Sequence, residues 1–132
     1  MDYFLGIDVG TGSARAGLFD ATGLLVAHHS HPIEIWKPRD KFVEQSSDNI
    51  WEAICRCSKL VIKNSKVDTS NIRGVGFDAT CSLVLIDAKG DSVSIDLEGD
   101  DRRNVIVWMD HRALLETTRL NALSEKYSVF NY

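Results

Sequence analysis

The chain has 132 residues, of which 44% are hydrophobic and 26% charged, a composition typical of one ordinary domain and not of a disordered or disulfide-rich chain. Its net charge is −4 and it has no cluster of Lys and Arg, which argues against sequence-independent binding to nucleic-acid phosphates. No apolar run approaches the roughly 18 residues of a membrane span, and the first residues do not resemble a signal peptide. The three cysteines lack C-x-x-C spacing, so we expect no disulfide. Together these features predict a cytoplasmic protein that has no membrane or nucleic-acid partner.

Short extended segments open the chain. Residues 3–9, 14–19 and 24–27 are mainly apolar and are separated by turn-forming Gly, Thr, Ser and Asp residues, so the sequence predicts a β-meander. Ser46 or Ser47 then offers an N-cap. Apolar residues recur at helical spacing after it, at Ile50, Ile54, Cys57 and Val61. This pattern predicts an amphipathic helix with one buried stripe.

The second half of the chain returns to strand character. Residues 72–80 and 105–108 are predicted strands, residues 83–86 are a further apolar run closed by a turn at 87–90, and residues 113–123 are a predicted helix. The acidic segment 96–103 lacks the spacing of a calcium loop and is expected to be a solvated surface loop. This order of elements favours an α/β or α+β fold with a mixed sheet. The apolar residues near the end, Tyr127, Val129, Phe130 and Tyr132, suggest a chain that continues into more structure.

The segment from Gly6 to Arg15 carries the strongest chemical signal. It lacks the lysine of a Walker A loop and the third glycine of a dinucleotide fingerprint. What remains is a carboxylate, Asp8, at the end of a strand, followed by a turn with exposed N–H groups and the hydroxyls of Thr11 and Ser13. Such a turn can hold phosphate oxygens, with Asp8 placing a hydrated Mg²⁺ and Arg15 adding positive charge. A glycine hairpin without any ligand is the alternative.

Three blocks of sequence together resemble a known family. Residues 8–13 resemble the first phosphate motif of the actin-like ATPase superfamily, and residues 74–84 and 107–113 look like the corresponding blocks of the FGGY carbohydrate kinases. Xylulose kinases typically carry Gln-Met-His-Gly, and glycerol kinases Asn-Gln-Arg-Glu, where this chain has Asp78-Ala79-Thr80-Cys81. This version resembles the ribulokinase branch, most closely the D-ribulose kinases.

The resemblance implies an RNase H-like (actin-like ATPase) α/β fold with a mixed sheet and flanking helices, of which residues 1–132 form the N-terminal portion of domain I. It also implies ATP and Mg²⁺ as cofactors and a ketopentose as substrate. The residues that it assigns are Gly10, Thr11, Gly12, Ser13 and Arg15 for the ATP phosphates, Asp8 for Mg²⁺ through water, and Asp78, Thr80, Cys81, Ser82, Trp108, Asp110 and Arg112 for the sugar.

Several of these residues have simpler interpretations. Residues 80–82 can be a polar bend between strands, Trp108 can belong to the core, and Asp110 can cap the helix that follows it. His28, His29 and His31 lie close together in sequence, but neighbours on a strand point to opposite faces, which argues against a metal site.

In the FGGY family the catalytic aspartate base and the second domain lie downstream of the region matched here. We therefore expect the chain alone to be inactive and the function to belong to a longer parent protein. A homodimer is one possible oligomeric state of that parent. The alternatives are an actin-like or Hsp70-like nucleotide-binding module without kinase activity, and a short regulatory isoform.

Overall fold

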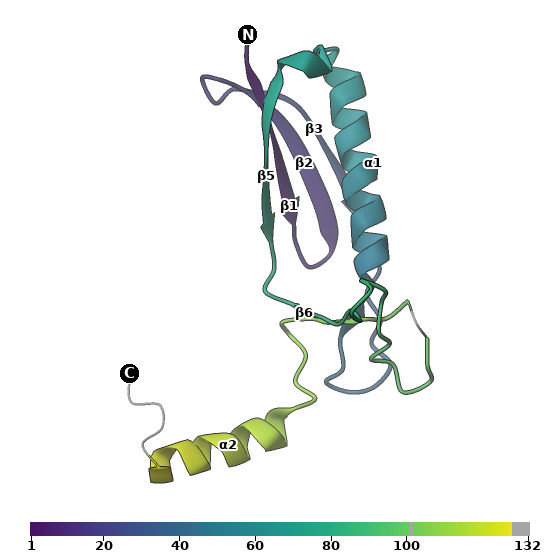
Figure 1. The fold of residues 1–132 in the computed structure, drawn as a ribbon, viewed down its shortest axis with the longest axis vertical. Coiled ribbons are helices and arrows are strands. Elements are labelled where there is room, and N and C mark those ends of the chain that lie inside the picture. Colours follow the sequence, from purple (N-terminus) through teal and green to yellow (C-terminus); the bar gives the residue numbers. More distant parts are fainter. Residues whose placement is uncertain (101, 128–132) are drawn as a thin grey trace.

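A four-stranded mixed sheet with one long helix against it forms the larger part of the computed structural model, which describes residues 1–100 and 102–127 (Figure 1). Its strands β1 (Tyr3–Val9), β2 (Ser13–Asp20) and β3 (Leu25–Pro32) form an antiparallel meander, which confirms the prediction, although β3 continues further than expected. The fourth strand, β5 (Ile72–Ala79), pairs with β1 in parallel, so the strand order is β3-β2-β1-β5. The carboxyl ends of β1 and β5 therefore lie together.

The helix α1 (Ser47–Ser65) leads from the meander to β5 and confirms the predicted amphipathic helix. Ser46 caps it: the Ser46 hydroxyl oxygen accepts a hydrogen bond from the Asn49 N–H over 3.2 Å. The helix ends at Lys66, whose φ of 56° is left-handed. A short 3₁₀ helix, Thr69–Asn71, completes the connection to β5.

The core lies between α1 and one face of the sheet. Along β1 the side chains alternate, so that Leu5, Ile7 and Val9 are buried beneath the helix while Asp8 points to the opposite face. The buried apolar residues of this core are Leu5, Ile7, Val9, Ala14, Ala16, Leu18, Ile33, Ala53, Ile54, Cys57 and Val61.

The helix covers β2 and β3 more than β5, and this leaves apolar surface on the last strand. Val75 and Phe77 of β5 lie on the helix side of the sheet, as their β1 register partners do, yet their exposed fractions are 55% and 60%. An apolar groove between α1 and β5 results, with Ile54 and Phe77 among its walls.

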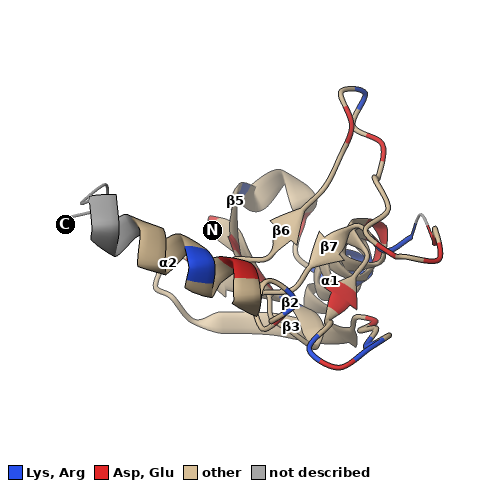
Figure 2. Ribbon diagram, turned by 90° about the horizontal axis from the view of Figure 1, so that it is seen from below, with Lys and Arg blue, Asp and Glu red and all other residues tan. Residues whose placement is uncertain are grey.

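A smaller antiparallel sheet lies beyond the carboxyl ends of β1 and β5. It has the order β4-β7-β6, with β4 at Glu44–Gln45, β7 at Val105–Ile106 and β6 at Leu83–Val84. The predicted strand at 105–108 is therefore shorter than expected, because its partners are only two residues long. Figure 2 shows Lys and Arg interspersed with Asp and Glu on the loops around these strands.

The buried Asn104 ties the small sheet to α1. Its side-chain oxygen accepts a hydrogen bond from the Ser47 N–H over 2.9 Å, and its side-chain nitrogen donates to the Leu85 carbonyl over 3.1 Å. Both ends of the amide are satisfied, so the start of α1 and the small sheet are held as one unit.

The second helix, α2 (Leu114–Tyr127), extends away from both sheets (Figure 1). It begins four residues after Asp110, so the alternative interpretation of Asp110 as its cap is wrong; one Asp110 carboxylate oxygen instead accepts a hydrogen bond from the Arg112 N–H over 2.9 Å. The side chain of Tyr127 and all of Val129, Phe130 and Tyr132 lie outside the described residues. Among the helices that the structure describes, none has the length and apolarity required to cross a membrane.

Candidate functional site

The turn between β1 and β2, residues 10–13, is closed by its own backbone. The Gly10 N–H donates a hydrogen bond to the Ser13 carbonyl over 3.0 Å. A Cβ atom at Gly10 would lie 2.6 Å from the Arg15 guanidinium, which crosses directly over this residue. Glycine at position 10 therefore allows the arginine to reach across the turn toward the end of β1.

The carbonyl groups of this turn are engaged by surrounding residues. The Thr11 carbonyl accepts a hydrogen bond from the Gln45 side-chain amide over 2.7 Å, and the Gly12 carbonyl accepts one from the Ile33 N–H over 3.1 Å. Within the described part of the chain, the N–H groups of Thr11 and Gly12 have no protein acceptor. A turn that keeps two N–H groups free while the carbonyls of the same two residues are occupied is suited to bind an anion.

Asp8 lies beside this turn on the face opposite α1. One of its carboxylate oxygens is 3.0 Å from an Arg15 guanidinium nitrogen, and both side chains are about half exposed. Asp78 of β5 is the register partner of Asp8, so a second carboxylate projects from the same face of the neighbouring strand. Carboxylate oxygens that solvent can reach are the donors that a hydrated Mg²⁺ prefers, and the residues present fit that ion.

The polar segment after β5 joins the end of β1. The Thr80 N–H donates to the Val9 carbonyl over 3.0 Å, and the hydroxyl oxygens of Thr80 and Ser82 are 3.4 Å apart. Cys81, between them, is exposed. Residues 80–82 therefore do form a bend between strands, but it places hydroxyl groups next to the 10–13 turn, where they are available to a ligand.

Trp108 connects this segment to the turn. Its backbone N–H donates to the Ser82 hydroxyl over 3.3 Å, and its indole Nε1–H donates to the Thr11 hydroxyl over 3.0 Å. The side chain is not part of the core, because Trp108 is 55% exposed. Its ring offers an apolar surface beside a group of hydroxyls, which is the arrangement that sugar sites use.

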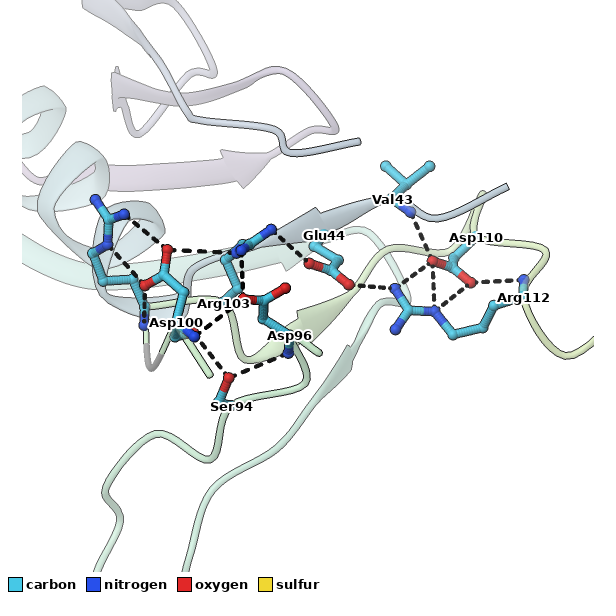
Figure 3. A network of polar contacts seen from close by, with 9 residues as sticks. Val43, Glu44, Ser94, Asp96, Asp100, Arg103, Asp110 and Arg112 are labelled. Carbon is cyan, nitrogen blue, oxygen red and sulfur yellow. Dashed lines mark hydrogen bonds and ion pairs between the residues drawn. The ribbon is translucent and has the colours of Figure 1, made fainter. Parts of the chain in front are cut away.

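Arg112 is paired with both Asp110 and Glu44 (Figure 3). A nitrogen of the Arg112 guanidinium lies 2.8 Å from both an Asp110 and a Glu44 carboxylate oxygen, and the Asp110 carboxylate also accepts the Val43 N–H over 2.7 Å. The Arg112 guanidinium carbon lies 4.1 Å from the centre of the Phe42 ring.

These contacts determine the charge states of the pair. Burial opposes the ionisation of Asp110, but the hydrogen bonds from Arg112 and Val43 outweigh it and lower the pKa of the Asp110 carboxyl. Burial also opposes the charge of Arg112, yet its bonds to Asp110 and Glu44 raise the pKa of the guanidinium. The two groups are therefore held as ions, and the carboxylate of Asp110 is 1% exposed.

Glu44 links this pair to a second buried arginine. Its other carboxylate oxygen is 3.4 Å from Arg103, which also lies 2.5 Å from Asp96 (Figure 3). The side chains of Asp96 and Arg103 are 3% and 10% exposed, so the expectation of a solvated loop at 96–103 is wrong for these residues. These two charged side chains can be buried because Arg103 forms ion pairs with both Asp96 and Glu44.

Glu44, Gln45 and Arg103 are site neighbours that sequence reasoning missed. Gln45 holds the 10–13 turn, and Glu44 holds Arg112. One signal in the sequence could have indicated them. Glu44 and Gln45 directly follow the apolar residues Phe42 and Val43, and a glutamate that is buried in a strand is almost always paired with a positive charge.

These features define a mixed α/β fold in which a turn suited to anions meets a strip of hydroxyl and ionic side chains at one end of the sheet. The model of the FGGY family of carbohydrate kinases, N-terminal domain, matches residues 3–131, and the chain belongs to this family. The expected α/β fold with a mixed sheet is confirmed, because solved structures of a xylulose kinase and a gluconate kinase share this arrangement.

The chain is similar to several curated proteins. It is 47% identical over 130 residues to a human FGGY carbohydrate kinase domain-containing protein, covering 98% of this chain and 23% of that one. It is 42% identical over 127 residues to a D-ribulokinase of Saccharomyces cerevisiae, covering 94% of this chain and 18% of that one. The chain thus spans less than a quarter of the length of these relatives.

Solved structures show the same fold at low identity. A xylulose kinase from Rhodospirillum rubrum matches with a TM-score of 0.76 at 21% identity, over 91% of this chain and 23% of that one. A gluconate kinase from Lactobacillus acidophilus matches with a TM-score of 0.76 at 19% identity, over 95% and 24%.

Proposed function

We propose that residues 1–132 are the N-terminal portion of domain I of an ATP-dependent carbohydrate kinase that phosphorylates a ketopentose, D-ribulose, to D-ribulose 5-phosphate. The observation that carries this proposal is the chain of hydrogen bonds that links Thr11 of the turn at 10–13 to Trp108, and Trp108 to Ser82. A kinase needs its phosphate donor and its hydroxyl acceptor side by side, and this end of the sheet brings both kinds of group together.

The 10–13 turn, which we call the phosphate turn, is assigned to ATP. Its free N–H groups, its hydroxyls and Arg15 would hold phosphate oxygens, and Asp8 would hold Mg²⁺ through water. When bound, Mg²⁺ neutralises phosphate charge. The residues of this chain then have the task of orienting the phosphates toward the sugar.

The residues after β5 and β7, at 78–82 and 108–112, are assigned to the sugar. Asp78, Thr80, Cys81 and Ser82 supply polar groups along one edge, and Trp108 supplies a ring surface. Arg112 is bound to both Asp110 and Glu44, so within this proposal Asp110 and Arg112 form part of the wall of the site and make few direct hydrogen bonds to the sugar. The catalytic base is assigned to the part of the longer protein beyond these residues, and the isolated chain should be inactive.

The choice of ribulose rests on the Asp78 to Ser82 sequence and on the similarity to a yeast D-ribulokinase. Membership of a carbohydrate kinase family favours a kinase over a nucleotide module without sugar. The test is a panel of D-ribulose, L-ribulose, xylulose and glycerol, assayed with Mg-ATP on the longer protein that carries this chain. Turnover of D-ribulose well above the others is expected, and a preference for xylulose or glycerol would refute the substrate assignment.

A further inference from the structure

A side-chain hydrogen bond crosses from the sugar side of the proposed site to the phosphate turn. The Trp108 indole Nε1–H donates to the Thr11 hydroxyl oxygen over 3.0 Å, although the two residues are 97 positions apart. The Ser82 hydroxyl accepts the Trp108 backbone N–H over 3.3 Å, so the base of the tryptophan is held from the segment after β5.

The direction of this bond follows from the chemistry of the two groups. An indole nitrogen can only donate, whereas a hydroxyl has one hydrogen to donate and lone pairs that accept. While the Thr11 hydroxyl accepts from Trp108, its own hydrogen must point to a different acceptor. The Thr11 carbonyl is already bound by the Gln45 amide and the Gly12 carbonyl by the Ile33 N–H.

We propose that Trp108 is a positioning residue for the nucleotide: its indole N–H directs the Thr11 hydroxyl to donate its hydrogen to an ATP phosphate oxygen. This inference rests on the assignment of the phosphate turn under the proposed function. Because more than half of Trp108 is exposed, a sugar that packs on its ring also fixes the indole against Thr11. Sugar binding and nucleotide binding are then linked, and each increases the affinity for the other.

Calorimetric titration of the longer protein with the Mg²⁺ complex of AMP-PNP, an ATP analogue that resists hydrolysis, tests the proposal. Trp108→Phe keeps a ring and removes only the N–H, and should weaken binding about two- to tenfold, the range expected for one hydrogen bond. Thr11→Val should weaken binding at least as much. The double variant should bind no more weakly than Thr11→Val alone, because both changes remove the same chain of donors. Thr11→Ser keeps the hydroxyl and should keep the affinity.

The matched control is Trp51→Phe, which changes a tryptophan of α1 that is 59% exposed and should leave the affinity unchanged. Melting curves of every variant separate lost affinity from lost folding. Unchanged affinity in a folded Trp108→Phe variant would overturn the proposal, as would additive losses in the double variant.

The sugar assays keep this result separate from the proposed function. If the parent binds Mg-AMP-PNP but phosphorylates no sugar, the kinase assignment fails while the affinities of the variants still decide the role of Trp108. If the parent binds no nucleotide, both fail.

Discussion

Asp8 and Asp78 are register partners on the parallel strands β1 and β5, and both carboxylates project from the face of the sheet opposite α1. Arg15 of β2 pairs with Asp8 from the other side. Two neighbouring carboxylates and one guanidinium leave an excess of negative charge at the end of the sheet, beside the phosphate turn. This charge pattern would favour a bound cation and is the basis for the first two predictions.

Asp8→Asn should strongly reduce the Mg-ATP-dependent turnover of the longer protein and leave its folding intact. The amide keeps the shape of the side chain but loses the negative charge that would hold a hydrated cation. The exposed ion pair with Arg15 contributes little to stability, about 0 to 1 kcal/mol. A matched control is Asp2→Asn, which breaks a pair with Arg73 of the same 3.0 Å length and similar exposure. Equal turnover in the two variants would make Asp8 a turn residue only.

Asp78→Asn distinguishes a sugar role from a metal role for the second carboxylate. If Asp78 binds the sugar, KM for D-ribulose should rise about tenfold or more while KM for Mg-ATP stays unchanged, since a hydrogen bond to a charged group contributes about 1.5 to 3 kcal/mol. Steady-state kinetics with each substrate varied in turn measures this. A rise confined to KM for Mg-ATP would contradict the sugar role and assign Asp78 to cation binding.

Glu44→Gln should destabilise the chain by about 3 kcal/mol. The carboxylate is 1% exposed and faces both Arg103 and Arg112, so its neutralisation weakens two buried charge-assisted contacts at once, although the arginines keep Asp96 and Asp110 as partners. Urea unfolding followed by circular dichroism measures the loss. Glu52→Gln on the exposed side of α1 is the control and should change stability by less than about 0.5 kcal/mol. A similar small effect at Glu44 would contradict the structural role of the network.

Asp110 should contribute to loss of stability in acid. Its carboxyl has a pKa below the ordinary value of 3.8, so the unfolded chain binds this proton more readily than the folded chain does. The contribution is therefore complete above about pH 5 and falls as the pH drops through about 4 toward the lower folded pKa. Urea midpoints at pH 7 and pH 3 should differ less in Asp110→Asn than in the unchanged chain. An identical difference would exclude this linkage, and Asp2→Asn serves as the exposed control.

The cysteines should react with thiol reagents in a fixed order. Cys81 is exposed, whereas Cys57 is buried and burial raises the pKa of its thiol, which lowers the fraction of reactive thiolate. Iodoacetamide labelling followed by peptide mass spectrometry should modify Cys81 first and Cys57 only after unfolding. D-ribulose bound to the longer protein should slow the labelling of Cys81 if that residue lies in the sugar site. Rapid labelling of Cys57 in the folded chain would contradict its packing.

The sequence was sufficient to predict the meander, α1 and β5, because their signals are local. The alternation of Leu5, Ile7 and Val9 and the recurrence of Ile54, Cys57 and Val61 are set by the periods of a strand and a helix. The match to the FGGY family agrees with the three blocks from which the resemblance was read. The individual site assignments stay predictions.

The small sheet and its ion network could not be predicted in this way. Glu44 meets Arg103 and Arg112 across 59 and 68 residues, and no periodic pattern records such a pairing. The separation of 59 residues between Glu44 and Arg103 also explains why Arg103 looked like part of a solvated loop. A helix cap was the simpler alternative for Asp110, and its actual contact with the Val43 N–H, from a residue 67 positions away, has no local signal in the sequence.

The alternation of β1 also protects the chemistry of the site against a folding error. β1 is paired on both edges, by β2 and by β5, and Asp8 stands between the buried residues Ile7 and Val9. A shift of the strand by one residue would place the Asp8 carboxylate beneath α1 and expel the core side chains of Leu5, Ile7 and Val9 into water. A molecule in that register would be too unstable to accumulate, so packing alone ensures that every folded copy presents Asp8 on the open face.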